Sequence, residues 1–138
     1  MAFFCRRRPR RDRRRPVCSR CESGMVAMTK FAVLHTNKDF RTLYYRGKSQ
    51  VHPGLVTYVR RNRLGIPRAG ITASKKLGNA VQRNRCRRVI REAYRELVPA
   101  VQGGWDLVFV ARGRTLHMKS TEVRRVMEAH LKKAGVLR

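Results

Sequence analysis

The chain of 138 residues carries 34 Lys and Arg against 8 Asp and Glu, which gives a formal net charge of +26. Its length fits one domain with a tail, and the charge indicates a polyanionic partner because such an excess otherwise destabilises a compact chain. The sequence contains no run of about 18 apolar residues, so it predicts no transmembrane helix. It also lacks an apolar segment followed by a cleavage site, so it predicts no signal peptide. We therefore expect a cytoplasmic protein that does not bind membranes and whose binding to nucleic acid depends on salt.

The first 24 residues differ in composition from the rest of the chain. They hold nine arginines without any apolar periodicity, which predicts a disordered tail at residues 1–24 before a domain at residues 25–138. Cys18 and Cys21 have the spacing of zinc ligands, but a structural zinc site needs four ligands. We predict no bound metal from this pair alone.

The domain begins with a short predicted helix and continues into strands. Thr36 or Asn37 is the expected N-cap, and Phe40, Leu43 and Tyr44 recur at helical spacing. Residues with high β propensity, alternating in places with polar ones, then predict three strands, at 49–52, 55–60 and 68–74.

A longer helix is predicted at residues 79–98. Its apolar residues share one arc, which is typical of a helix packed on a core, and they are Cys86, Val89, Ile90, Ala93, Tyr94 and Leu97. A strand at 105–111 and a helix at 119–134, capped by Ser120 or Thr121, complete the chain. The order αβββαβα predicts an α+β fold in which helices pack on a small mixed sheet.

The other half of the long helix is rich in arginine. Its guanidinium groups come from Arg83, Arg85, Arg87, Arg88, Arg91 and Arg95, with Asn84 among them. A run of charge is usually a solvated face, but here only Glu92 and Glu96 lie nearby. Arginine binds phosphate through two parallel hydrogen bonds and stacks on bases, so this half of the helix indicates nucleic-acid binding.

The run from Lys75 to Arg88, followed by Arg91 and Glu92, resembles the signature of the protein subunit of bacterial ribonuclease P. Its Arg-Asn-Arg core at residues 83–85 matches the hallmark of that family. The resemblance extends over about residues 31–135 and implies a left-handed strand–helix–strand crossover. It also implies a holoenzyme in which a catalytic RNA, with bound Mg²⁺, cleaves precursor tRNA endonucleolytically to give the mature 5′ end.

The resemblance assigns two sets of binding residues. The residues that would face the catalytic RNA are Lys75, Lys76, Asn79, Arg83, Asn84, Arg85, Arg87, Arg88 and Arg91. Phe40, Tyr44 and Tyr58 match the cleft that binds the 5′ leader of precursor tRNA. Aromatic residues at helical spacing are also common in protein cores, so both interpretations of these three residues stay open.

The sequence predicts no catalytic residue in the protein itself. Its acidic residues are scattered over separate elements, and its four histidines share no spacing, whereas a nuclease site needs converging carboxylates or histidines. The expected partners are the ribonuclease P RNA and precursor tRNA, without an obligate protein partner.

Two alternatives remain open. A ribosomal or RNA-chaperone protein without a role in cleavage would share the small size and the charge. Residues 1–24 precede Met25 and Met28, near which members of the resembling family begin. They are either an adventitious upstream start or an RNA-binding tail.

Overall fold

The structure is a computed structural model that describes residues 32–137. The tail at residues 1–24, with Cys18 and Cys21, lies outside the described residues. The boundary of the tail and the absence of a metal bound to the two cysteines therefore stay predictions. Within the described part, no helix combines the length and the apolar character that are needed to cross a membrane.

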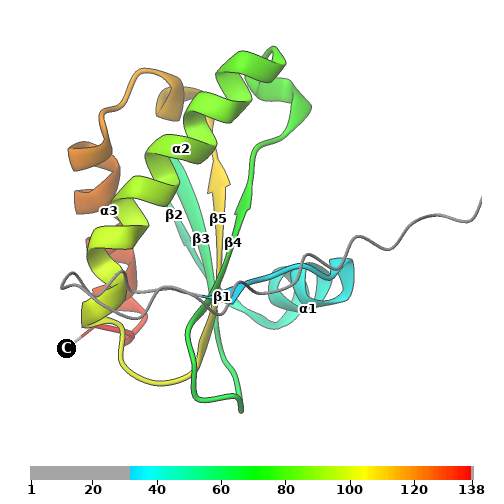
Figure 1. Cartoon of the computed structure of the whole chain (residues 1–138), viewed down its shortest axis with the longest axis vertical. Helices are drawn as coiled ribbons and strands as arrows, with labels where there is room; N and C mark the ends of the chain where they lie inside the picture. Colours follow the sequence, from blue (N-terminus) through cyan, green and yellow to red (C-terminus); the bar gives the residue numbers. More distant parts are fainter. Residues whose placement is uncertain (1–31, 138) are drawn as a thin grey trace, which may run out of the picture.

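The described chain forms a five-stranded mixed sheet with three α-helices, which confirms the predicted α+β fold (Figure 1). The strands, in the sheet order β1-β4-β5-β3-β2, are Ala32–Val33, Arg68–Thr72, Trp105–Ala111, Leu55–Arg61 and Lys48–Val51. The helices are α1 (Asn37–Arg46), α2 (Ala80–Leu97) and α3 (Ser120–Lys133). Short 3₁₀ turns lie at η1 (Lys75–Leu77), η2 (Val98–Ala100) and η3 (Gly113–Leu116).

The structure differs from the predicted elements in two details. Strand β1 was not predicted, because its two residues are too few to show a period and are held only by parallel pairing with β4. The N-cap of α3 is Lys119, not Ser120 or Thr121, and its backbone N–H donates to the Glu122 carboxylate at 3.1 Å. The predicted cap of α1 at Thr36 is confirmed, since its hydroxyl oxygen accepts from the backbone N–H of Asp39.

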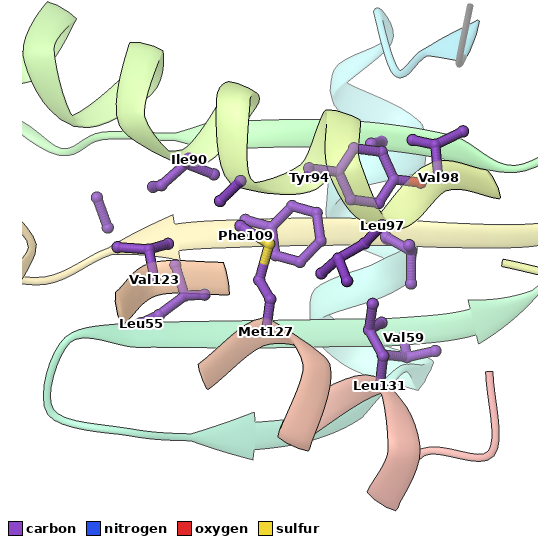
Figure 2. Packing of buried hydrophobic residues seen from close by; sticks show 14 of the residues in the cluster. Leu55, Val59, Ile90, Tyr94, Leu97, Val98, Phe109, Val123, Met127 and Leu131 are labelled. Atoms are coloured by element: carbon purple, nitrogen blue, oxygen red, sulfur yellow. The ribbon is translucent and has the colours of Figure 1, made fainter. Parts of the chain in front are cut away.

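Helices α2 and α3 cover one face of the sheet and enclose the main core (Figure 2). The predicted apolar arc of α2 is confirmed, because all of its residues are buried except Val89, which still packs against the core. Tyr94 of α2 meets Phe109 of β5 with ring centroids 5.1 Å apart, while Met127 of α3 approaches from the other side. Burial of these large side chains fixes the height of α2 above the sheet.

The connection from β4 through α2 to β5 joins two parallel neighbouring strands. In Figure 1 both strands run upward, β4 lies to the right of β5, and α2 passes in front of the sheet. This arrangement is a left-handed crossover, as the family resemblance implied and against the usual right-handed preference. It places the N-terminus of α2 beyond the end of β4.

Helix α1 covers the opposite face of the sheet and lies unusually close to it. Leu43 of α1 is buried against Leu34 and Val108 in a second, smaller core. Beneath the helix, Gly70 of β4 leaves room for the ring of Phe40, since a Cβ atom at this glycine would lie 2.6 Å from that ring. A glycine in a strand interior often marks such a close approach.

Candidate nucleic-acid interface

The N-terminus of α2 is fixed by a reciprocal cap. The Asn79 side chain accepts from the backbone N–H of Gln82 at 2.9 Å, and the Gln82 side chain accepts from the backbone N–H of Asn79 at 3.1 Å. Gly78, just before the cap, has φ +119°, a conformation that favours glycine. Its Cβ would also collide with the Gln82 side chain. The cap and the glycine together place exposed Lys75 and Lys76 directly before the helix.

The arginines of α2 occupy two positions. Arg85, Arg88 and Arg91 are exposed and line an open hollow, and the full lining is Val81, Asn84, Arg85, Arg88, Val89, Arg91, Glu92, Arg95 and Ser120. Arg83 and Arg87 do not line this hollow and are half-buried, although the sequence analysis placed them on the same half of the helix. The structure thus brings four of the nine predicted RNA-binding residues into one hollow.

The half-buried arginines also differ in their partners. Arg87 donates to the Asn84 side-chain oxygen at 3.3 Å. The Nε of Arg83 is buried and has no hydrogen-bond partner among the described residues. Buried donors are normally paired, so Arg83 Nε departs from the usual pattern.

The two glutamates of α2 do not neutralise the residues of the Arg-Asn-Arg run. Glu92 accepts from Arg95 at 3.2 Å, and Glu96 accepts from Arg124 of α3 at 2.8 Å. Both contacts lie toward the C-terminal part of the helix. The N-terminal half of α2 therefore keeps its positive charge, which suits a polyanion.

The three predicted leader-binding aromatics meet on the other face of the sheet. Tyr44 of α1 packs edge-on against Tyr58 of β3 with centroids 5.0 Å apart, and Phe40 lies 6.5 Å from Tyr44. The Tyr44 hydroxyl is 3.1 Å from the Thr72 hydroxyl of β4. Phe40 and Tyr58 also pack against the smaller core, while Tyr44 is 39% exposed. We call Phe40, Tyr44 and Tyr58 the aromatic cluster; it is partly core and partly surface.

An ion pair beside this cluster was missed by sequence reasoning. The Arg68 guanidinium donates to both carboxylate oxygens of Asp106, each at 2.7 Å, and Asn62 donates to the same carboxylate at 2.8 Å. Burial raises the pKa of Asp106, but the hydrogen bonds from Arg68 and Asn62 outweigh it, so its pKa lies below the usual value. Only the register that pairs Arg68 with Asp106 could have revealed the contact.

The described residues do not gather into a metal-binding cluster. Among residues 32–137, no three His, Cys, Asp or Glu side chains group closely enough to hold a metal ion. His130 is buried and lies 3.0 Å from the Thr57 hydroxyl through its Nδ1, while His52 Nδ1 accepts from the backbone N–H of Gly54. The arrangement can bind and position a polyanion.

Comparison with known proteins gives one consistent result. The family model described as Ribonuclease P matches residues 28–135. The ribonuclease P protein component of Clostridium botulinum (strain Loch Maree / Type A3) is 41% identical over 104 residues, which cover 75% of this chain and 94% of that protein. The component of Symbiobacterium thermophilum is 38% identical over 111 residues, covering 80% of this chain and 96% of that protein.

Solved structures agree with the sequence relatives. The structure of the Staphylococcus aureus RNase P protein is similar with a TM-score of 0.70 and 33% identity, covering 79% of this chain and all of that chain. The RNase P protein from Thermotoga maritima is similar with a TM-score of 0.65 and 28% identity, covering 72% and 94% of the two chains.

Proposed function

The chain belongs to the family of bacterial ribonuclease P protein components, and from that premise we propose which of its surfaces bind RNA. As a family member it is the protein subunit of a ribonucleoprotein endoribonuclease in 5′ tRNA processing, associated with ribonuclease P RNA and precursor tRNA. The ribosomal or RNA-chaperone alternative gains no support, since the relatives and structures compared are ribonuclease P proteins. We further propose that the protein acts in the cytoplasm.

The catalytic RNA is proposed to bind the N-terminal part of α2. The proposed contacts are Lys75, Lys76, Asn79, Arg83, Asn84, Arg85, Arg87, Arg88 and Arg91. The observation that carries this proposal is the unneutralised charge: Glu92 and Glu96 pair with Arg95 and Arg124 and leave the Arg-Asn-Arg run free of carboxylate partners. A capped helix also fixes the backbone that carries these side chains, so less backbone entropy is lost when they bind phosphate.

The leader of precursor tRNA is proposed to bind the aromatic cluster. Stacking on an aromatic ring tolerates any base, which suits leaders of varied sequence. Tyr44 offers its exposed ring, and the Tyr44–Thr72 hydroxyl pair adds a polar group that can hydrogen-bond a nucleotide. The left-handed crossover puts α2 and α1 on opposite faces, so the two RNA segments would bind separate surfaces.

The bond chemistry is proposed to belong to the RNA subunit. The described residues do not fit a Mg²⁺ site, because their carboxylates are dispersed or engaged in ion pairs with arginine and lysine. Magnesium prefers oxygen ligands such as carboxylates and phosphates, which a folded RNA supplies in abundance. The protein would therefore contribute binding and orientation, by stabilising the folded RNA and holding the substrate on it.

The direct test adds the purified chain to a bacterial ribonuclease P RNA at a low Mg²⁺ concentration and measures cleavage of precursor tRNA. Cleavage at the mature 5′ end should be stimulated strongly, and a buffer-only reaction and a comparably basic unrelated protein serve as controls. A folded chain that fails to stimulate a cognate RNA would reject the proposal.

A further inference from the structure

We infer that the outward side of α1 is a second contact surface for single-stranded RNA. It would bind leader nucleotides upstream of those at the aromatic cluster. This inference rests on the proposed leader site and extends it. The outer surface of α1, as we call it, consists of Asn37, Lys38, Arg41, Thr42, Tyr45 and Arg46, which line an open hollow.

The outer surface follows the geometry of the helix. Its members are spaced at i, i+1, i+4, i+5, i+8 and i+9, which keeps them on one stripe of an α-helix. Leu43 and Phe40 lie on the opposite stripe, packed against the smaller core. The outer surface is therefore the side of α1 that faces away from the sheet.

Tyr45 is the most exposed large apolar side chain of the described residues, at 87%. Its neighbour in the chain, Tyr44, contacts Thr72 and Tyr58. Tyr45, in contrast, belongs to neither hydrophobic core of the described residues, so packing does not explain a tyrosine at this position. A ring carried on a helix and open to solvent is a suitable platform for a stacked base.

The charges around Tyr45 complement a phosphate backbone. Lys38, Arg41 and Arg46 surround it along the stripe. No described carboxylate forms an ion pair with these three cations. The only acid of α1, Asp39, instead lies 3.7 Å from Arg68 and accepts from the Thr36 hydroxyl. Cations that follow a backbone beside an aromatic ring are the combination that binds single strands.

The position of the surface identifies its occupant. Tyr44 borders the aromatic cluster, and Tyr45 is the next residue, about 100° further round the same helix. A strand that leaves the cluster over the exposed ring of Tyr44 would meet Tyr45 next. The occupant is therefore the upstream continuation of the leader. A separate RNA or a protein is a competing outcome of the test.

The experiment measures the affinity of the reconstituted holoenzyme for precursor tRNAs whose leaders are lengthened one nucleotide at a time. The wild type should gain affinity in two phases, the first from the aromatic cluster and the second from the outer surface. Tyr45→Ala should abolish the second phase, a loss of roughly 5- to 100-fold for long leaders, and leave short leaders unchanged. Tyr45→Phe should retain it, because the stacking ring remains.

Controls separate this surface from general effects. Val51→Ala removes another exposed apolar side chain, on edge strand β2, and should leave the affinity unchanged at every leader length. Arg41→Ala should reduce the salt dependence of binding only for long leaders. Equal loss for all substrates, including mature tRNA, would show a contact with the catalytic RNA and overturn the inference. Unchanged affinity of Tyr45→Ala at every length would overturn it as well.

The proposed leader site is tested independently in the same series. Tyr44→Ala should weaken the binding of precursor tRNAs with short and with long leaders alike. Tyr45→Ala should weaken only the binding of those with long leaders. If Tyr44→Ala has no effect while Tyr45→Ala does, the aromatic cluster is rejected as the leader site and the outer surface still binds the leader. The reverse pattern rejects the outer surface alone.

Discussion

Arg68 and Asp106 face each other across the parallel strands β4 and β5 and share two hydrogen bonds of 2.7 Å each. The pair lies on the face covered by α1, and Asp39 of that helix approaches the same guanidinium at 3.7 Å. One arginine thus connects two strands and a helix. A parallel, two-bond arrangement is among the stronger polar contacts of proteins.

We expect Asp106→Asn to lower the free energy of unfolding at neutral pH by about 1–3 kcal/mol, because it leaves Arg68 partly buried with only Asp39 as a distant partner. The lowered pKa of Asp106 stabilises the fold above the unfolded value of about 3.9. That contribution is lost as the pH falls through the folded pKa. Urea unfolding between neutral and acidic pH should therefore show a flatter acid limb for the variant.

The matched control for this change is Glu128→Gln, which removes a surface ion pair with Lys132. It should alter stability little, since exposed pairs contribute weakly. Equal effects of the two substitutions would contradict a special role for Asp106.

We expect the stability of the fold to depend on pH in a second range, because of His130. Burial lowers its pKa, and the nearby charges of His52 and Lys133 lower it further. An unfolded histidine takes up a proton near pH 6.5, so the unfolded chain binds the proton first and stability falls as the pH drops below that value. His130→Gln should remove this loss when thermal unfolding is compared at pH 7.5 and about 5.5.

The exposed His117 supplies the control, as His117→Gln should retain the wild-type loss. Because Thr57 contacts His130, the variant must first be shown to fold at pH 7.5. A loss of the same size in the His130 variant would assign the pH dependence to other groups.

Charge reversal on α2 should weaken binding to the ribonuclease P RNA. In the Arg83→Glu/Arg87→Glu variant, guanidinium groups proposed to bind phosphates are replaced by repelling carboxylates. The slope of log affinity against log salt should become shallower by about one unit for each phosphate that the protein no longer neutralises. Filter binding over a salt series measures this slope.

Arg125→Glu, on the exposed side of α3, changes charge without touching the proposed interface. It should leave the slope close to that of the wild type. If this control and the α2 variant lose affinity equally, net charge alone explains binding.

Tyr58→Ala should reduce affinity for precursor tRNA but not for mature tRNA. Loss of one stacking ring is worth about 1–3 kcal/mol for each base. Tyr58 also supports Tyr44 edge-on, so removing it should loosen both rings. Tyr58→Phe preserves that edge-on packing and should bind nearly as well as the wild type. An equal loss for both tRNAs in the alanine variant would mark Tyr58 as structural.

Much of the fold could be predicted because the signals for its helices and strands lie in short stretches of sequence. The apolar period of α2, the cap at Thr36 and the strand at Trp105–Ala111 all depend on residues close in sequence. Strand β1 could not be predicted, since two residues carry no period and only the partner strand β4 defines it. The handedness of the crossover came from a resemblance, because local patterns do not encode it.

The candidate site likewise has features that the sequence predicts and features that only the packing of the elements reveals. The arginines of α2 follow from a contiguous run, but the half-buried setting of Arg83 and the share of Ser120 in the hollow depend on tertiary packing. The meeting of Tyr44 with Tyr58 likewise requires knowing which face of the sheet α1 covers. Sequence spacing identifies which residues are candidates; the packing of elements decides which become neighbours.

Gly70 links the packing of α1 on the sheet to the proposed leader site. A Cβ atom at this position would lie 2.6 Å from the Phe40 ring, so the ring would have to move. Because Phe40 belongs to the aromatic cluster, a substitution at buried Gly70 would disturb the proposed leader site without touching RNA. The shape of that site would then depend on a buried backbone position as well as on the rings themselves.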